Sequence, residues 1–397
     1  MNMKRRTFIG TLSVAGLGQT LAQSSGPLSP VKKTSLVRTP LVLMAPRADG
    51  CEAVWAVNRL SRGRIEWEAE DGSSGRAGAD AFGFVPQGDN ILRVRVSGLT
   101  PGQSYRVRSV TQAADNDETQ VSAWKSFRTL SPTAAATRFV VWNDTHIHND
   151  TIRGLHQATP AADFLLWNGD TCNNWTDQEL FVPTLLHPGE CDISTDRPLF
   201  ITWGNHDVRG ALAFKMPELV ATPSGRPFYA FRSGPVAVIC LDTGEDKPDD
   251  HPSFRGRVAF DVLRAEQTQW LQETIRRPEF RDAPYRVVFC HIPLRWRNEQ
   301  LPNYDQGGFD HFSARGRAAW HEALVAWKTQ IILSGHTHSD AWLPPTEEFP
   351  YGQLVGGGPQ WERATWIEGV ADLDQLRFKT TNLEGKVLHD VTLKPLT

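Results

Sequence analysis

The stretch that decides the fold reads Leu199-Phe-Ile-Thr-Trp-Gly-Asn-His-Asp207. It is a short apolar run that ends in amide, imidazole and carboxylate side chains. Five further segments repeat the pattern, and the six together span 138–146, 164–170, 199–207, 236–242, 286–291 and 330–338. Continuous apolar runs of this length indicate strands that are buried on both faces.

The polar ends of these runs predict one shared crevice. In open α/β sheets, the loops that leave the carboxyl ends of the strands converge at one edge of the sheet. Five of the six loops carry carboxylate, amide oxygen or imidazole groups, which are the ligands that divalent metals prefer. The sequence therefore indicates an α/β fold with a metal site at a sheet edge.

In these residues the chain resembles the calcineurin-like metallophosphoesterase superfamily. That family carries Asp-x-His, Gly-Asp, Gly-Asn-His-Asp/Glu, a single His after a strand, and Gly-His-x-His, in this order. All five blocks are present, at Asp144/His146, Gly169/Asp170, Gly204/Asn205/His206/Asp207, His291 and Gly335/His336/His338. Each block alone is a weak signal, and an isolated histidine is more often a core or surface residue. The ordered set, which covers roughly 137–397, is highly specific.

The resemblance implies a centre that holds two divalent metal ions. Carried over residue by residue, it assigns Asp144, His146 and His338 to one metal, Asn205, His291 and His336 to the other, and Asp170 to both. Two such cations can clamp the attacking and leaving oxygens at phosphorus and generate hydroxide near neutral pH. His206, a non-ligand, is then the candidate general acid, oriented by a carboxylate such as Asp207.

The implied function is hydrolysis of phosphodiesters or phosphomonoesters by an exported enzyme. The alternative is a secreted binding protein whose metal-stabilised phosphoesterase core is not catalytic. His206 favours the enzyme, because a structural site needs its ligands but does not need a non-ligand histidine. The nearly balanced formal charge of −3 argues against nucleic acid as the main partner. A small-molecule phosphate ester is the expected substrate, and the sequence leaves the oligomeric state open.

The amino terminus predicts export. Lys4-Arg5-Arg6-Thr-Phe-Ile-Gly10 precedes a modestly apolar stretch at 11–21, which matches a twin-arginine signal peptide over 1–22. The stretch is too short and too rich in Gly and Ser for a membrane span. A disordered basic tail is the alternative, but it explains neither the paired Arg nor the apolar segment. We expect a periplasmic or secreted protein.

The export route bears on the choice of metal. Twin-arginine export carries proteins that are already folded, so the metals can be inserted in the cytoplasm. Affinity for a nitrogen and oxygen site rises from manganese through iron to copper, and zinc also binds tightly. Folding in a buffered cytoplasm favours manganese and/or iron as the native pair, with zinc as the alternative.

Residues 34–130 show alternation of apolar and polar residues in place of continuous apolar runs, and this pattern predicts a small β-sandwich. Strict alternation at 91–96 and 105–108 is typical of strands with one buried face. Leu99-x-Pro101-x-x-x-Tyr105 resembles the corner of fibronectin type III domains, where a Tyr pins the turn. This segment contains no His, so we expect it to supply no chemistry. A linker at 131–137 would lead into the catalytic domain at 137–397.

The resemblance to the metallophosphoesterase superfamily implies a four-layer sandwich for 137–397, with two mixed sheets flanked by helices. Helices are expected at 264–276 and 314–327, and alternation at 375–380 and 385–391 predicts a terminal antiparallel ribbon. The five cysteines are too few for a disulfide scaffold, although Cys172 and Cys191 could pair in an oxidising compartment.

Differences between these motifs and those of other phosphatases indicate which branch of the superfamily the chain resembles. A leading sandwich before this core is similar in layout to purple acid phosphatases. Those enzymes, however, carry an iron-binding Tyr where this chain has Asn173, and they lack the counterpart of His146. The sequence after Asp170 also lacks the Asp-Arg-Gly of serine/threonine protein phosphatases. The pattern is nearer to the bacterial phosphodiesterase branch. Asn173 or Asn174 could hold a phosphate oxygen or simply form the turn.

Two further sets of side chains could reach the substrate. Arginines in segments near the site are candidates for phosphate contact, and they are Arg209, Arg295, Arg297, Arg315 and Arg317. Tryptophans near the ligand loops could form a platform for a flat group, and they are Trp142, Trp167, Trp175, Trp203 and Trp296. An aromatic residue beside an apolar strand is more often part of the core.

Overall fold

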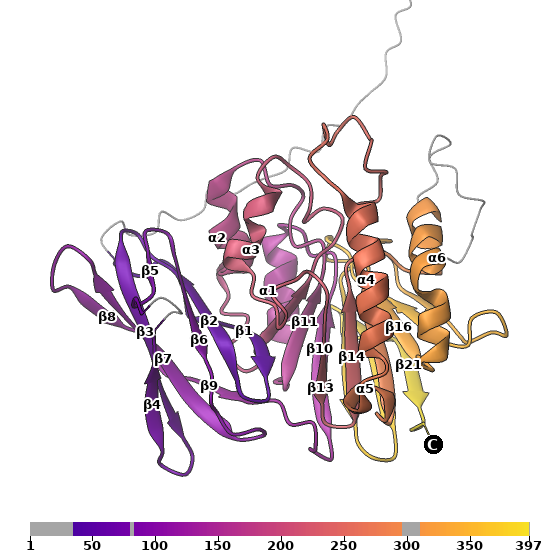
Figure 1. Cartoon of the computed structure of the whole chain (residues 1–397), viewed down its shortest axis with the longest axis horizontal. Helices are drawn as coiled ribbons and strands as arrows, with labels where there is room; N and C mark the ends of the chain where they lie inside the picture. Colours follow the sequence, from indigo (N-terminus) through magenta and orange to yellow (C-terminus); the bar gives the residue numbers. More distant parts are fainter. Residues whose placement is uncertain (1–34, 80–82, 296–309, 397) are drawn as a thin grey trace, which may run out of the picture. The chain divides into compact units, whose positions relative to one another are not determined.

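The structure, a computed structural model, describes residues 35–79, 83–295 and 310–396 (Figure 1). The predicted signal segment at 1–22 and the candidates Trp296 and Arg297 lie outside the described residues. Export therefore stays a prediction. Within the described part, no helix has both the length and the apolar character needed to cross a membrane.

Two sheets form the middle of the phosphoesterase part. The larger sheet has nine strands in the order β21 (Val387–Leu393), β20 (Leu376–Asn382), β19 (Thr365–Ala371), β10 (Thr137–Trp142), β11 (Phe164–Asn168), β12 (Leu199–Thr202), β1 (Val42–Arg47), β2 (Gly50–Ala56) and β6 (Ile91–Val96). The other has six strands in the order β13 (Tyr229–Ser233), β14 (Val236–Leu241), β15 (Tyr285–Cys290), β16 (Ile331–Ser334), β18 (Gly352–Val355) and β17 (Ala341–Leu343). All six apolar runs of the sequence are strands in these sheets, and they pair in parallel as two sets of three, β10-β11-β12 and β14-β15-β16.

Among the described residues, six α-helices cover the outer faces of the two sheets (Figure 1). They are α1 (Asn149–Ala158), α2 (Phe181–Leu185), α3 (Met216–Leu219), α4 (Phe260–Thr274), α5 (Pro278–Arg281) and α6 (Asp310–Ala326). The helices expected from the sequence at 264–276 and 314–327 are confirmed as α4 and α6, which begin four residues earlier than expected. Three short 3₁₀ segments, at Gln178–Leu180, Pro188–Glu190 and Ala213–Lys215, complete the helical structure of the described ranges.

Successive side chains of each strand point to opposite faces of the sheet, so each sheet contributes to two separate hydrophobic cores. In β10, Phe139 points between the two sheets and stacks on Phe164 with ring centroids 5.1 Å apart. Trp142, three residues further along the strand, faces the other way and packs under α1, α2 and α3. On the far side, Leu271 of α4 and Trp320 of α6 pack against the second sheet. The predicted four-layer α/β sandwich is confirmed.

The strands of the N-terminal segment are divided between two sheets, and the segment is not confirmed as an independent domain. Its outer sheet runs β4 (Ser74–Ala77), β3 (Ser61–Ala69), β7 (Ser104–Ala113) and β8 (Thr119–Val121), with β5 (Gln87–Gly88) on β3 and β9 (Lys125–Arg128) on β7. Tyr105 accepts a hydrogen bond from the Thr100 backbone N–H at 2.8 Å, so the expected tyrosine contact is present. The inner strands β1, β2 and β6 belong to the nine-stranded sheet, which they join through the parallel pairing of β1 with β12.

The inner strands differ from the one-sided pattern expected for a free sandwich. Leu43 and Trp55 face the sandwich core, whereas Val42, Met44 and Val54 face the core beneath α1 to α3. Strands β1 and β2 are therefore buried on both faces. The physical reason is that β12 would otherwise be a sheet edge with unpaired backbone groups, which β1 covers.

The predicted C-terminal ribbon is confirmed as β20 and β21, joined through β19 to β10 in the larger sheet. This pairing places β10, β11 and β12 in the interior of that sheet. The carboxyl ends of the three strands therefore lie in positions that the rest of the sheet holds on both sides.

Candidate metal centre

The seven predicted ligands all follow strands of the two central sheets. Asp144 and His146 come after β10, Asp170 after β11, Asn205 after β12, His291 after β15, and His336 and His338 after β16. Because the strands within each set run in parallel, their carboxyl ends meet at one edge.

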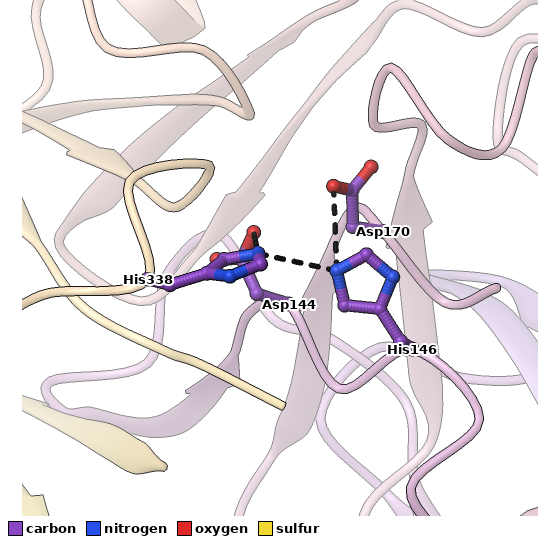
Figure 2. A group of neighbouring side chains, drawn as sticks. All are labelled: Asp144, His146, Asp170 and His338. Carbon is purple, nitrogen blue, oxygen red and sulfur yellow. Dashed lines mark hydrogen bonds and ion pairs between the residues drawn. The ribbon is translucent and has the colours of Figure 1, made fainter. Parts of the chain in front are cut away.

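One group of ligand atoms comprises Asp144, His146, Asp170 and His338 (Figure 2). These atoms all lie within 4.8 Å of one another. The Nε2 atoms of His146 and His338 are 3.2 Å apart, and His338 Nε2 is 3.5 Å from Asp144 Oδ1. Figure 2 shows the two rings and the two carboxylates directed at a common point. This is the arrangement of a coordination shell.

A second group comprises Asp170, His291 and His336, again with ligand atoms within 4.8 Å of one another. His291 Nε2 lies 3.2 Å from Asp170 Oδ2. Asn205 joins this group, since its Oδ1 atom is 2.8 Å from His336 Nδ1. Asp170 belongs to both groups, which is the position that a bridging carboxylate requires.

Backbone carbonyls fix the tautomers of two of the ligand rings. His146 Nδ1 lies 3.0 Å from the Cys172 carbonyl, and His291 Nδ1 lies 2.9 Å from that of Asn168. Each contact directs the other ring nitrogen to the centre of the site, as is usual for metal-bound histidines. His291 Nε2 is buried and makes no hydrogen bond of acceptable geometry. A cation would satisfy this atom, so the residues fit a metal.

Burial keeps the other imidazoles in the neutral form that binds metals. It lowers the pKa of His146 to about 4 and that of His336 to about 3. The two carboxyl groups behave differently, since burial raises the pKa of Asp144 whereas the surrounding histidines hold that of Asp170 below its usual range. Two buried carboxylates at this spacing are best compensated by cations.

Five of the ligands have left-handed backbone conformations. The φ angles are 52° for Asp144, 45° for His146, 53° for Asp170, 70° for His336 and 49° for His338. Nine non-glycine residues of the described part have positive φ, so more than half of these strained positions lie at this one site. Such conformations persist only where surrounding structure enforces them, and they concentrate at functional sites.

The motif glycines allow the backbone to approach the ligands closely. A Cβ at Gly204 would lie 2.3 Å from Asp170 Oδ1, and one at Gly335 would lie 2.3 Å from Asp144 Oδ2. No side chain fits at either position. These glycines are therefore part of the site itself, although neither is a ligand.

His206 lies beside the ligands but belongs to neither of the two groups found in the described residues. Its ring centroid is 4.9 Å from that of His146. His206 Nδ1 is 2.7 Å from the Asn173 carbonyl, and Arg209 donates to Nε2 at 2.9 Å. The Asn173 contact uses the backbone oxygen, so a phosphate-binding role for the side chains of Asn173 and Asn174 stays a prediction.

The expectation that Asp207 orients His206 is wrong. The Asp207 carboxylate accepts hydrogen bonds from the Gly204 backbone N–H at 2.8 Å and from Thr171 N–H and Oγ1 at 3.0 and 2.5 Å. It thus ties the loop after β11 to the loop after β12. Neighbouring residues in a turn direct their side chains to different surroundings, which is why adjacency in sequence was misleading.

A cavity of about 520 Å³ opens beside the second group. Its lining combines site residues with an apolar wall, and it consists of Asp170, Asn205, His206, Asp246, Pro293, Arg295, His336, Thr337, His338, Ser339, Ala341, Leu343 and Val355. Of the candidate arginines, Arg295 lines this cavity and Arg209 contacts His206. Arg315 donates to Asp261, and Arg317 to the Leu294 carbonyl.

Among the described residues, the side chains of the candidate tryptophans and cysteines have no evident role at the site. Trp142, Trp167 and Trp175 are fully buried in the core beneath α1 to α3, and Trp203 packs at its margin. All five cysteines are free thiols, so Cys172 and Cys191 do not form a disulfide.

Sequence reasoning missed Glu245 and Asp246, which follow β14. The signal was present, because 236–242 was the one apolar run without an assigned ligand.

The fold and the paired ligand groups define an α/β protein with a candidate dinuclear metal centre. Residues 137–340 match the family model described as calcineurin-like phosphoesterase. The chain belongs to this family, as its motifs indicated.

Named relatives are phosphatases of low identity. Purple acid phosphatase 21 of Arabidopsis thaliana is 24% identical over 271 residues, which are 64% of this chain and 54% of that protein. Human serine/threonine-protein phosphatase CPPED1 is 25% identical over 205 residues, which are 50% of this chain and 60% of that protein. The matches thus span little more than half of these relatives.

A solved structure shares the fold over most of the chain. The purple acid phosphatase PPD1 from yellow lupin seeds matches with a TM-score of 0.69 and 14% identity, covering 89% of this chain and 74% of that one. The match covers more of the chain than the family model does. The expected similarity in layout to purple acid phosphatases is confirmed at the level of the fold.

Proposed function

We propose that this protein hydrolyses phosphomonoesters or phosphodiesters with two divalent metal ions. The observation that carries this proposal is the sharing of Asp170 by two separate ligand groups. When bound, the two cations would supply charge neutralisation at the phosphoryl group and a strong nucleophile at neutral pH.

His206 is the proposed general acid at the leaving group. It lines the cavity and lies next to His146. In this arrangement Arg209 donates to Nε2, so the ring is held as an acceptor at that atom. The proposed proton transfer therefore requires that Arg209 release Nε2 when a phosphate group enters the cavity, and that Nε2 take up a proton from water before it donates to the leaving group. Arg209 would then be placed to contact the phosphate.

The apolar wall of the cavity supports an organic ester as substrate. Pro293, Ala341, Leu343 and Val355 are the apolar residues of its lining. A leaving group with an apolar surface would bury that surface there. We propose small phosphate esters with organic leaving groups, processed outside the cytoplasm by a manganese and/or iron enzyme, with zinc as the alternative.

The test is a panel of phosphomonoesters and phosphodiesters with purified protein reconstituted separately with manganese, iron or zinc. We expect two metal ions per chain and turnover of at least one ester class. A folded protein that holds two ions but leaves even an activated nitrophenyl ester intact would refute the enzymatic proposal. Periplasmic recovery after expression of the full chain, and its loss with Arg5→Lys and Arg6→Lys together, would test the export route.

A further inference from the structure

A network of four charged side chains lies beside the second ligand group. Glu245, Asp246 and Lys247 follow β14, and Arg209 follows β12. Glu245 is fully buried, and Asp246 is only 4% exposed. Arg209 and Lys247 both pair with Glu245 and with Asp246. Two cations and two carboxylates thus compensate one another in a mostly buried place.

Asp246 connects this network to a predicted metal ligand. Its Oδ1 atom accepts from Arg209 at 2.7 Å and from Lys247, while its Oδ2 atom accepts from Asn205 Nδ2 at 3.5 Å. Asn205 is 1% exposed, so water has little access to replace this contact. The carboxylate therefore uses each of its oxygens for a different neighbour.

The contact matters because an amide side chain has two unlike ends. Only the oxygen can bind a cation, and the NH₂ group would repel one. Asn205 Nδ2 faces Asp246, which places Asn205 Oδ1 2.8 Å from His336 Nδ1, within the second ligand group. A carboxylate can only accept, so it selects this orientation of the amide over the flipped one.

The same carboxylate also acts on His206 through Arg209. Arg209 donates through Nε to Glu245, through one terminal nitrogen to Asp246, and through the other to His206 Nε2 at 2.9 Å. A guanidinium has no acceptor, so the imidazole nitrogen facing it carries no proton. His206 Nδ1 then carries the proton and donates to the Asn173 carbonyl.

We propose that Asp246 is a positioning residue, which directs the Asn205 oxygen into the second metal group and, through Arg209, holds the ring of His206. This inference rests on the proposed two-metal function. Asp246 touches neither a reacting atom nor a metal in this role. Its effect on the metal passes through the orientation of one amide.

Two substitutions separate orientation from charge. Asp246→Asn leaves one acceptor oxygen, which cannot serve Arg209 and Asn205 together. Glu245→Gln is the matched control, because it removes the same charge and also borders Arg209, whereas the described contacts of Glu245 do not include Asn205. Any loss of metal affinity that is specific to Asp246→Asn therefore reflects the contact with Asn205.

Calorimetric titration of metal-free protein with manganese, together with metal analysis after dialysis, provides the first readout. We expect Asp246→Asn to weaken binding at one of the two sites by about 10–100-fold, as for partners that orient metal ligands. The other site, and both sites in Glu245→Gln, should change little. Equal weakening in the two variants, or none in Asp246→Asn, would overturn the proposal.

A second readout needs no metal. In nitrogen-15 spectra of the metal-free protein, the Asn205 NH₂ protons should exchange slowly with solvent, and Asp246→Asn should accelerate that exchange. Unchanged exchange in a folded variant would also overturn the positioning role. A wild-type chain that shows this protection but binds fewer than two metal ions would refute the proposed function and leave the amide contact established.

Discussion

Asp170 is the residue on which the two halves of the site depend. Its carboxylate lies in both ligand groups, whereas His146 lies in only one. Its oxygens also interact with the protein, because Oδ1 accepts from the His206 backbone N–H at 2.8 Å and Oδ2 lies 3.2 Å from His291. The conformation of this one side chain therefore affects the loops after β11, β12 and β15.

Substitution of Asp170 should affect both metals. We expect Asp170→Ala to retain neither ion after dialysis, because each group loses a shared anionic ligand. His146→Ala should keep the ion held by His291, His336 and Asn205 and lose mainly the other. Metal analysis of the wild type and both variants is the measurement. Equal loss from the two variants would show that Asp170 does not bridge.

His206→Ala should keep both metals and lose most of its turnover. The expected reduction is about 10²–10⁴-fold, as for removal of a general acid. It should be smaller for esters with good leaving groups such as nitrophenol, because these need little protonation. The rates on matched good and poor leaving groups, with metal content as the control, decide the matter. The same reduction on both kinds of ester would assign His206 a different role.

Asp242 should make stability depend on pH. It is buried at the end of β14, and its Oδ2 atom has no hydrogen-bond partner. Burial raises the pKa of Asp242 to about 6 from 3.8, with the Gly244 N–H opposing this effect. The folded state then holds the proton more tightly than the unfolded state. The resulting stabilisation is complete below pH 3.8 and is lost as the pH rises through 6.

Asp242→Asn should therefore gain stability relative to the wild type as the pH rises from 4 to 7. The gain should approach about 3 kcal/mol, since each pKa unit corresponds to about 1.4 kcal/mol. Urea unfolding of metal-free protein at several pH values measures it. A difference in unfolding free energy that stays constant across this range would show that Asp242 is charged in both states.

At the scale of the elements, the features that could not be predicted from the sequence are the conformations and contacts of the loops after the strands. The order of the motifs predicted which side chains gather at the site, because apolar runs and the polar residues that follow them can be recognised in the sequence. The left-handed conformations of Asp144 and His336 were not predictable, since they depend on contacts between loops that are far apart in the chain. Asp207 was misassigned for the same reason: Thr171, its partner, follows a different strand.

The loop after β12 should tolerate no side chain at Gly204. We expect Gly204→Ala to displace the carboxylate of Asp170, because the added Cβ would lie 2.3 Å from its Oδ1 atom. Both metals should then bind weakly while the rest of the fold persists. Gly225→Ala is a suitable control, since a Cβ there would meet nothing within 4 Å, although its positive φ adds some strain. Normal metal content in Gly204→Ala would contradict the close approach.

At the scale of the whole molecule, three of the described N-terminal strands, β1, β2 and β6, are part of the larger central sheet. The alternation of β6 was visible in the sequence, and the strand is indeed more deeply buried on one face. The burial of β1 and β2 on both faces was not recognisable, because the sequence of a short apolar strand does not indicate which elements pack on its two faces. Lys125, which is 8% exposed, reinforces the junction through a contact of 2.6 Å with Asp192 and another with the Leu41 carbonyl.

A chain that begins at Thr137 should therefore fold poorly. It would lose the partner of β12 and the side chains of Val42, Met44 and Val54 from the core beneath α1 to α3. Each large side chain lost from a buried core costs about 2–5 kcal/mol, which is comparable to the whole stability of a domain. An uncovered β12 would also invite association between chains. We expect aggregation or a lowered Tm with incomplete metal binding, measured by gel filtration, thermal unfolding and metal analysis.

The matched control begins at Gln23, which keeps every described residue. A monomeric chain from Thr137 with the Tm and two metals of this control would show that the sandwich is dispensable for folding. Its remaining role would then be limited to the substrate, because it contains no histidine and none of its described side chains belongs to either ligand group.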